Sequence, residues 1–361
     1  MTTSDAYEAL AEKLGFPGSA LLHSILEDLM TPKEAAMAEA LPATVAEIAE
    51  KVGVSEAEAR EGLDNLFFKG VVYPRGDFNN RDYYRFTRSI MQMHDATLGS
   101  SKIDIHRDRD FCQKWHDFSK QEMYPYWSAL IKDATARRSR IVPARKSLEG
   151  LSDVLPCEDY HELLRAQEVI AVVPCSCRTR SAAAGEPCAH SDETATWHCL
   201  QFGRGAEYVI ARGCGKELTV EEAIDVCDKI EDDGLLHRWA NKTGMTGVNT
   251  SCNCCRDCCE ELVSQELAGI PVGSRWEKSR YDAYVADLES CNGCGDCVER
   301  CQFDAVTLYQ DAAGDTKAAI EAEKCFGCGA CVVSCPFESL RMRAVRPPEH
   351  IPEVVPGTGA L

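Results

Sequence analysis

Residues 291–302 read CNGCGDCVERCQ, and residues 325–336 read CFGCGACVVSCP. Both stretches place three cysteines at every third position and a fourth cysteine four residues later. Glycines lie between the cysteines, at Gly293 and Gly295 and again at Gly327 and Gly329. Glycine permits positive φ angles, which a chain needs when it wraps closely around a compact group. The paired stretches therefore predict two tightly wound loops that present thiolates to metal.

This spacing is typical of two [4Fe-4S] clusters in bacterial ferredoxins, where the fourth cysteine of each run serves the other cluster. The first cluster would then be held by Cys291, Cys294, Cys297 and Cys335, and the second by Cys325, Cys328, Cys331 and Cys301. Two zinc sites are the competing interpretation, but they require neither the last spacing nor Pro336. Gln302 stands where a proline usually follows the first run, which puts hydrogen bonding at the second cluster in question. A hairpin is expected between the runs, around residues 312–315.

The overall composition limits the classes of function. With 361 residues, the chain is long enough for two or three domains. Its 39 basic and 58 acidic side chains give a formal charge of −19, which argues against nucleic acid and suits docking on redox partner proteins. The polar N-terminus does not resemble a signal peptide, and no apolar run has membrane length. The 21 cysteines are therefore expected to be reduced, metal-binding thiols in a cytoplasm.

A second set of cysteines lies in the middle of the chain. An apolar run at 169–173 is followed by four cysteines, and residues 252–259 read CNCCRDCC. The nine candidate ligands are Cys175, Cys177, Cys188, Cys199, Cys252, Cys254, Cys255, Cys258 and Cys259. Three interpretations stay open: one or two additional [4Fe-4S] clusters, a structural zinc, or a redox-active pair of adjacent cysteines. The first is favoured because the cysteine runs near the C-terminus could supply electrons. We expect surface or outer-sphere roles for His190, His198 and His237, and core packing for Cys112, Cys157 and Cys227.

The N-terminal part shows signals of helices followed by a hairpin. Thr44 with Glu47 and Ser55 with Glu58 form capping boxes, and strands are expected at 71–73 and 83–86. This order resembles winged helix-turn-helix domains of bacterial regulators. Residues 1–98 hold 9 basic and 16 acidic side chains, and the second helix is acidic. Phosphate would be repelled, so protein interaction or dimerisation is favoured over DNA binding. Arginines of the wing keep the DNA-binding alternative open: Arg75, Arg81, Arg85 and Arg88.

Taken together, these features resemble a group of multidomain 4Fe-4S ferredoxin-type proteins of anaerobic bacteria. The resemblance is carried by residues 175–178 (CSCR), by residues 252–259 and by the eight cysteines of the two runs. It implies an α+β protein in five parts: a winged-helix-like domain (1–98), a helical connector (99–168), a Cys-rich α/β domain (169–275), a ferredoxin domain (276–343) and a Pro-rich tail (344–361).

The expected function is electron transfer, as a subunit or dedicated donor of a larger anaerobic oxidoreductase system. Oligomerisation through the N-terminal domain is expected as well. No G-x-G-x-x-G fingerprint follows a strand, so the chain is not expected to accept hydride from NAD(P)H by itself. Two alternatives stay open: a reductase with its own substrate site at the middle cysteines, and a redox-sensing transcriptional regulator.

Overall fold

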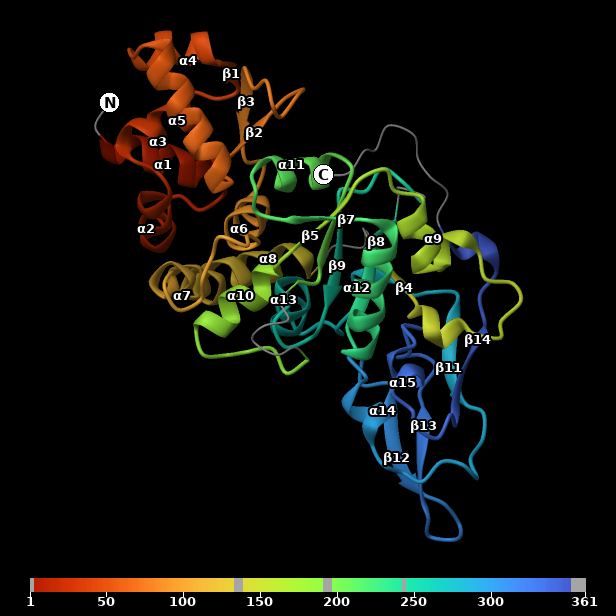
Figure 1. Cartoon of the computed structure of the whole chain (residues 1–361). Helices are drawn as coiled ribbons and strands as arrows, with labels where there is room; N and C mark the ends of the chain where they lie inside the picture. The colour runs from red at the N-terminus through yellow and green to blue at the C-terminus, as the bar shows by residue number, and fades with distance from the viewer. Residues whose placement is uncertain (1–2, 133–138, 191–196, 242–244, 352–361) are drawn as a thin grey trace. The chain divides into compact units, whose positions relative to one another are not determined.

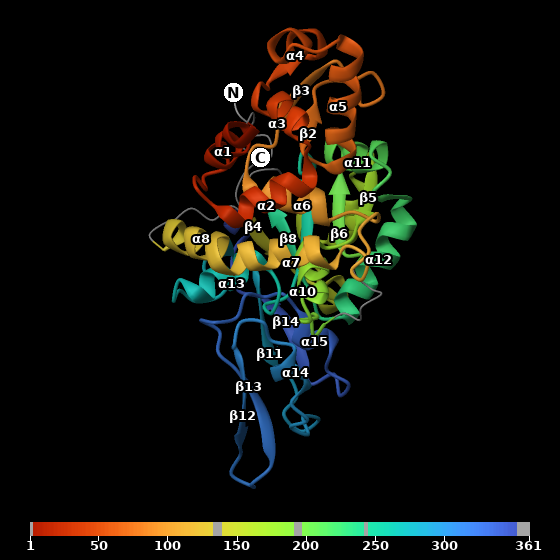
Figure 2. The same cartoon turned by 90° about the vertical axis from the view of Figure 1, so that its left-hand side faces the viewer.

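The computed structural model describes residues 3–132, 139–190, 197–241 and 245–351. It mixes helices and sheets, which confirms the expected α+β class (Figures 1 and 2). The chain divides into two compact units, which we describe separately. The first comprises Met1–Met123, Val173–Pro187 and Glu207–Lys216, and the second comprises Tyr124–Val172, Cys188–Ala206 and Glu217–Leu361. The five-part division expected above stays a prediction.

The first unit begins with helices packed beside a small sheet. The elements up to its hairpin are α1 (Thr3–Lys13), α2 (Ala20–Leu29), α3 (Pro32–Glu39), β1 (Ala43–Thr44), α4 (Val45–Val52), α5 (Glu56–Lys69), β2 (Val72–Pro74) and β3 (Tyr83–Phe86). The sheet has the order β1-β3-β2, with antiparallel pairs. Both predicted capping boxes are confirmed, at Thr44 and at Ser55. Gly53 and Gly70 end α4 and α5 in the left-handed conformation, which glycine adopts without strain.

Further helices complete the first unit. They are α6 (Ile90–Leu98), α7 (Arg109–Phe118), a π-helical turn (Ser119–Met123), α10 (Ser176–Ala183) and most of α11 (Arg204–Ala211). Trp115 and Phe118 of α7 are fully buried, and Cys112 lies beside them in the interior. The expectation that Cys112 is a packing residue is therefore confirmed.

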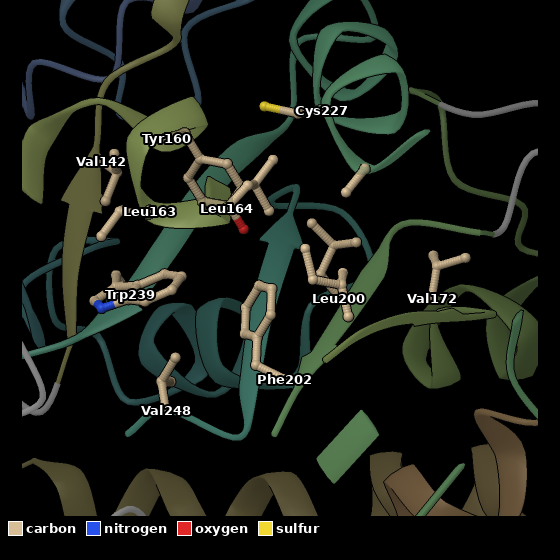
Figure 3. Packing of buried hydrophobic residues seen from close by; sticks show 12 residues of the cluster. Val142, Tyr160, Leu163, Leu164, Val172, Leu200, Phe202, Cys227, Trp239 and Val248 are labelled. Carbon is tan, nitrogen blue, oxygen red and sulfur yellow. The ribbon is translucent and has the colours of Figure 1, made fainter. Parts of the chain in front are cut away.

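The second unit is built on a seven-stranded mixed sheet with the order β10-β4-β8-β9-β6-β5-β7. Its strands are β4 (Ser139–Val142), β5 (Ile170–Val173), β6 (Cys199–Phe202), β7 (Lys216–Leu218), β8 (Leu236–Ala240), β9 (Thr250–Cys254) and β10 (Trp276–Glu277). Its helices are α8 (Tyr124–Ile131), α9 (Tyr160–Arg165), α12 (Val220–Asp232) and α13 (Glu260–Leu267), with short 3-10 turns at Arg145–Leu148 and Pro156–Glu158. Side chains from these strands meet α9 and α12 in one core around Tyr160, Phe202 and Trp239 (Figure 3).

One strand of this unit was not predicted. Ser139–Val142, within the expected helical connector (99–168), forms β4, between β8 and β10. Ile141 and Val142 are buried there, so tertiary burial of two β-branched side chains decides the local structure. Four residues are too few to show a strand period in the sequence.

The C-terminal part of the second unit consists of two antiparallel pairs and two short helices. The pairs are β11 (Tyr281–Val285) with β14 (Leu340–Ala344), and β12 (Val306–Gln310) with β13 (Thr316–Ile320). The short helices are α14 (Asp296–Glu299) and α15 (Ala330–Val333), one after each cysteine loop. The predicted hairpin between the two cysteine runs is thus confirmed.

The start of the expected tail is attached rather than free. The backbone N–H of Val345 donates to the carbonyl of Arg280, and Arg346 donates to the carbonyl of Ser279 and contacts Asp282 at 3.0 Å. A 3-10 turn follows at Pro348–His350, where His350 contacts the Lys278 carbonyl at 2.9 Å. The rest of the expected tail, from residue 352, lies outside the described residues. None of the described helices has both the length and the apolar character needed to cross a membrane.

Candidate metal centres

The first cysteine run meets the last cysteine of the second run. One hollow of about 340 Å³, open solvent included, is lined by Cys291, Cys294, Cys297 and Cys335 together with Leu308 and Leu340. Gly293 has φ 70°, and a Cβ there would lie 2.5 Å from the Thr316 carbonyl oxygen. The close approach of the hairpin to this loop therefore requires glycine. The four thiols are arranged as the crossed ligation predicts, and their role as ligands stays a prediction.

The second run gathers around Cys301 in the same way. Burial raises the pKa of Cys328 to about 12 and the pKa of Cys331 well above its usual range, and the neighbouring Cys301 and Cys325 add to both. Uncompensated thiolates would be costly here, so these positions suit sulfur bound to metal. Backbone amides donate to the sulfurs: Ala305 N to Cys301 Sγ at 3.2 Å, Gly327 N to Cys325 Sγ at 3.4 Å and Ala318 N to Cys291 Sγ at 3.4 Å. Buried thiols with amide donors fit [4Fe-4S] clusters.

The middle cysteines divide into two groups within the second unit. Cys252 and Cys254 lie two residues apart on β9, Cys199 begins the neighbouring strand β6, and Cys259 is the N-cap of α13. Hydrogen bonds join the thiols in a chain from Cys199 to Cys252, Cys254 and Cys259. We call these residues the four-thiol group.

A half-buried cation faces the four-thiol group. Arg238 on β8 places Nη2 3.4 Å from Cys252 Sγ and also pairs with Glu261. Gln201 Nε2 donates to Cys199 Sγ at 3.2 Å. Hydrogen bonds from the Cys199 and Cys254 thiols, together with Arg238, hold the pKa of Cys252 well below its usual range. The surroundings of Cys252 thus favour the thiolate, which is the form that binds metal.

The other middle cysteines form a tighter set. Cys188 Sγ lies 3.2 Å from Cys255 Sγ, which lies 3.1 Å from Cys258 Sγ. Asp257 Oδ1 is 3.7 Å from Cys188 Sγ, and the Ala189 amide donates to Asp257 Oδ2 at 2.7 Å. The ligand atoms of these four residues all lie within 4.8 Å of one another. We call Cys188, Cys255 and Cys258, with Asp257, the three-thiol group.

Two candidate ligands belong to neither group. Cys175 and Cys177 lie at the start of α10 in the first unit, whereas both groups lie in the second unit. They stay candidates without an assigned centre. Cys214, which the sequence pattern did not single out, is fully buried, and burial raises its pKa.

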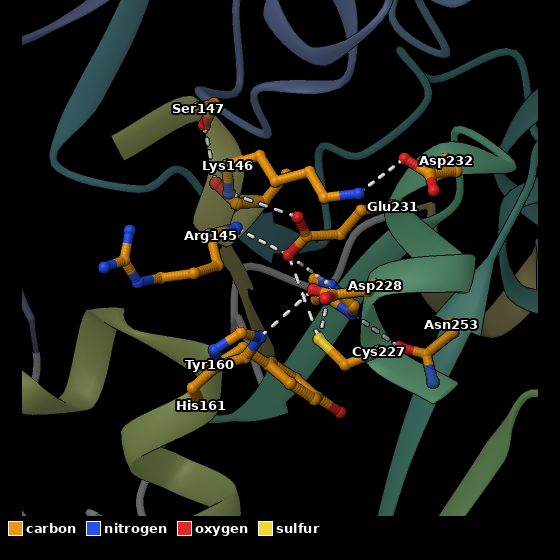
Figure 4. Close-up of polar contacts among 12 residues, drawn as sticks. Arg145, Lys146, Ser147, Tyr160, His161, Cys227, Asp228, Glu231, Asp232 and Asn253 are labelled. Carbon is orange, nitrogen blue, oxygen red and sulfur yellow. Dashed lines mark hydrogen bonds and ion pairs between the residues drawn. The ribbon is translucent and has the colours of Figure 1, made fainter. Parts of the chain in front are cut away.

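A polar network holds the residue between Cys252 and Cys254 in place. Asn253, labelled in Figure 4, accepts a 2.7 Å hydrogen bond from His237 Nδ1 at its Oδ1. Asn253 Nδ2 donates to the carbonyl of His198 at 2.5 Å. On the other side of the ring, His237 Nε2 pairs with Glu231 at 3.3 Å and lies 3.6 Å from Cys227 Sγ. His198 and His237 are buried, so the surface role considered for them is wrong, whereas an outer-sphere role fits.

Cys227, Glu231 and His237 also have their ligand atoms within 4.8 Å of one another. The Glu231 carboxylate already accepts hydrogen bonds from the backbone amides of Arg145 (2.5 Å) and Lys146 (3.2 Å). Tyr160 stacks on the imidazole with ring centroids 4.0 Å apart. Cys227 packs in the core beside Ala223, as expected. These contacts satisfy the groups without metal, so we assign them to support of β9.

The four-thiol group and the second ferredoxin run share one packed core. Cys252, Cys254 and Cys259 pack in the same cluster as Cys301 and Cys328. Phe326, next to Cys325, and Phe303, two residues after Cys301, stack with centroids 4.2 Å apart in this cluster. Gly273 approaches both rings so closely that a Cβ would lie 2.6 Å from Phe303 and 2.8 Å from Phe326. Apolar and aromatic atoms thus fill the space between the two sets of thiols.

The contacts of Gln302 explain why glutamine, rather than the usual proline, follows the first ferredoxin run. It is buried, its Oε1 accepts a 2.8 Å hydrogen bond from the Arg256 amide, and its Nε2 lies 3.0 Å from His190 Nε2. Arg256 also pairs with Asp304 at 2.6 Å. Gln302 therefore connects the first ferredoxin run to the CNCCRDCC segment, a contact that proline could not make.

The division of the middle thiols follows from a signal that the sequence interpretation did not use. Side chains of a strand alternate between faces, so Cys252 and Cys254 share one face of β9. Cys255 and Cys258 carry the Cys-x2-Cys spacing of a metal knuckle. Cys199 completes the four-thiol group and Cys188 completes the three-thiol group. Both are distant in sequence from residues 252–259, so only the folded structure shows which group each one joins.

Comparison with known proteins agrees with the C-terminal geometry. A family described as a 4Fe-4S dicluster domain matches residues 290–339. Searches of curated proteins and of solved structures found no significant match. The match and the cysteine-rich groups together identify an iron–sulfur protein with a ferredoxin-like C-terminal domain.

Proposed function

We propose that this protein transfers electrons through two [4Fe-4S] clusters held by the ferredoxin-like domain and a third iron–sulfur centre held by the four-thiol group. When bound, such a cluster supplies a reversible one-electron step. The observation that carries the proposal is the shared core of Cys252, Cys254 and Cys259 with Cys301 and Cys328. A metal group in each set would be separated by packed side chains rather than by solvent.

The residues around the four-thiol group would serve this function in two ways. Arg238 places a positive charge beside Cys252, which favours the more negative, reduced state of any iron–sulfur centre bound there. Phe303, Phe326 and Trp276 exclude water from the space between the thiol sets. Low water access lowers the reorganisation that accompanies a change of charge.

We place the docking surface for a redox partner at the other end of the ferredoxin-like domain. Cys294 is exposed, unlike the other cysteines of its set. Leu308 and Phe337 line the hollow of the same four thiols and are 42% and 43% exposed. Exposed apolar side chains at a cofactor site are typical of a transient protein interface. A subunit or donor role in a larger oxidoreductase system fits this surface.

For the N-terminal helices and hairpin we propose a protein-interaction role rather than DNA binding. Arg81 of the wing is occupied by Asp64 at 2.8 Å, and Arg85 donates to Gln92 at 3.1 Å. The α5 side chains Glu56, Glu58 and Glu61 remain exposed. Phosphate contacts need free cations, which this surface offers sparingly.

The proposed third centre can be tested by electron paramagnetic resonance of the reduced full-length protein. We expect magnetic interaction between the third centre and the Cys301 cluster, because their ligands share one core. Cys259→Ala should remove this interaction and leave the spectrum of a two-cluster ferredoxin. Cys157→Ala, at a half-buried cysteine outside every thiol group, is the control and should change nothing. A wild-type spectrum that already equals that of Cys259→Ala would refute the third centre.

A further inference from the structure

We infer that the three-thiol group is a mononuclear zinc site, distinct in chemistry from the iron–sulfur centres beside it. The inference rests on the proposed function only in assigning the four-thiol group and the eight ferredoxin cysteines to iron–sulfur clusters. Its own basis is the spacing, burial and contacts of Cys188, Cys255, Cys258 and Asp257.

The sulfur spacing indicates a single ion. Two thiolates at about 2.3 Å from one tetrahedral zinc are roughly 3.8 Å apart, whereas a cubane holds each thiolate on a separate iron, so its ligand sulfurs stand farther apart. The observed Sγ–Sγ distances are 3.2 Å for Cys188–Cys255 and 3.1 Å for Cys255–Cys258. Within residues 290–339, all of them described, no two cysteine sulfurs make a hydrogen-bond contact. The sulfurs of the three-thiol group are thus somewhat closer than on a bound zinc and much closer than in a cubane, which suits a single ion.

The donor set completes a zinc site. Cys255 and Cys258 have the Cys-x2-Cys spacing of zinc knuckles, and zinc accepts carboxylate together with thiolate. Asp257 lies between them in sequence, and its second oxygen is fixed by the Ala189 amide at 2.7 Å. Such a contact orients a carboxylate ligand. The four ligand atoms already lie within 4.8 Å of one another.

The three sulfurs of the site are shielded from water, whereas the Asp257 carboxylate is exposed. Cys188, Cys255 and Cys258 are buried with Ile230 and Leu235 in one apolar cluster. A disulfide requires an S–S distance of about 2.05 Å, so none of the three thiols is bonded to another. A closed, apolar shell is typical of structural zinc.

The site's position indicates what zinc would do. The knuckle loop is docked on the ferredoxin-like domain through the Arg256 amide to Gln302 and the Arg256 side chain to Asp304. Cys254 and Cys259 of the four-thiol group flank the knuckle directly in sequence. Zinc would thus fix the segment that carries the four-thiol group next to Cys301, as a positioning element without a redox step of its own.

Adjacent cysteines provide a matched test. Full-length Cys258→Ala and Cys259→Ala would be purified anaerobically from cells supplied with iron and zinc, and iron and zinc per chain would be measured. We expect Cys258→Ala to lose about one zinc and to keep its iron, and Cys259→Ala to lose about four irons and to keep its zinc. Loss of about four irons from Cys258→Ala, with no zinc in the wild type, would overturn the inference. Unchanged iron in Cys259→Ala would instead refute the third iron–sulfur centre and leave the zinc site standing.

A second measurement does not depend on any variant folding. X-ray absorption at the zinc edge of the wild-type protein should show about three sulfur ligands near 2.3 Å and one oxygen ligand near 2.0 Å.

Asp257→Ala should lower zinc affinity by 10-fold or more, whereas Asp311→Ala, on the exposed hairpin, should not change it. Sub-stoichiometric zinc in the wild type, or four sulfur ligands and no oxygen, would contradict the proposed ligand set.

Discussion

The loops at 290–339 and the segments that carry the middle thiols both present clusters of cysteines, but they do so by different physical means. In the loops, glycine-rich turns bring cysteines at every third position to one centre, so the ligand set follows from local spacing. In the middle region, strand alternation and two distant positions, Cys188 and Cys199, decide which thiols meet. Spacing thus predicts a metal centre when one loop supplies three of its four ligands, and it fails when a sheet and distant positions supply them.

The largest expected effect tests whether the loops hold clusters as their spacing indicates. Cys328→Ala should lose about four irons per chain, because Cys328 is a predicted ligand of a single cluster. Its thiol is half-buried and lies among Cys301, Cys325 and Cys331, which limits replacement by a solvent ligand. Iron and acid-labile sulfide analysis provides the measurement. Cys157→Ala serves as the control, and equal iron in the two variants would contradict the assignment.

The next effect tests the packed core that joins the two regions. Gly273→Ala should destabilise the second unit by about 2–4 kcal/mol, since its Cβ would clash with Phe303 and Phe326 in addition to the strain at φ 85°. Gly269→Ala is the matched control, because it has φ 69° but no atom within 4 Å of the added Cβ. It should cost only about 1–2 kcal/mol. Anaerobic chemical denaturation compares the two, and equal losses would show that the contact with the aromatic pair is unimportant.

A smaller effect tests the charge that distinguishes the four-thiol group. Arg238→Leu removes the cation 3.4 Å from Cys252 Sγ. The potential of a centre bound there should fall on the order of 60 mV, equivalent to about 1.4 kcal/mol for one electron. Redox titration followed by paramagnetic resonance reports the change. Arg238→Lys should recover most of it, and a rise in potential in the Leu variant would exclude the proposed electrostatic role.

The smallest effect concerns the first unit and its occupied wing. Burial opposes ionisation of Asp64, but hydrogen bonds from Arg81 and Tyr84 outweigh it and lower the pKa of its carboxyl. A lowered folded pKa gives stability that is present above the unfolded value, near 3.9, and is lost as pH falls through the folded value. Asp64→Asn should therefore cost stability at pH 7 and progressively less below pH 4. The expected cost at pH 7 is only about 1 kcal/mol, because solvent screens the partly exposed pair. Thermal unfolding at pH 7 and pH 3.5 checks this, and a loss independent of pH would contradict it.

Local signals in the sequence predicted much of the fold. The capping boxes at Thr44 and Ser55 and the hairpin between the cysteine runs are all present, because each depends on neighbouring residues alone. Strand β4 was not predicted from the sequence, because its four residues form a strand only through their pairing between β8 and β10. The role of Gln302 also escaped notice, as its partners Arg256 and His190 are distant in sequence.

The candidate centres show the same limit. The adjacent Cys254 and Cys255 belong to different groups, as do Cys258 and Cys259, because each pair straddles a change of backbone direction at an end of the knuckle. The positions of these cysteines in the sequence do not show which of the two groups each one belongs to. The strand period of two was the available clue for Cys252 with Cys254. The thiols that complete each group come from outside the motif.

The count of iron and acid-labile sulfide per chain in anaerobically purified wild-type protein tests the central claim most directly. The proposed three iron–sulfur centres predict about twelve irons and about twelve sulfides per chain. About eight of each, after reconstitution with excess iron and sulfide, would contradict the third centre and would confine the electron-transfer role to the ferredoxin-like domain.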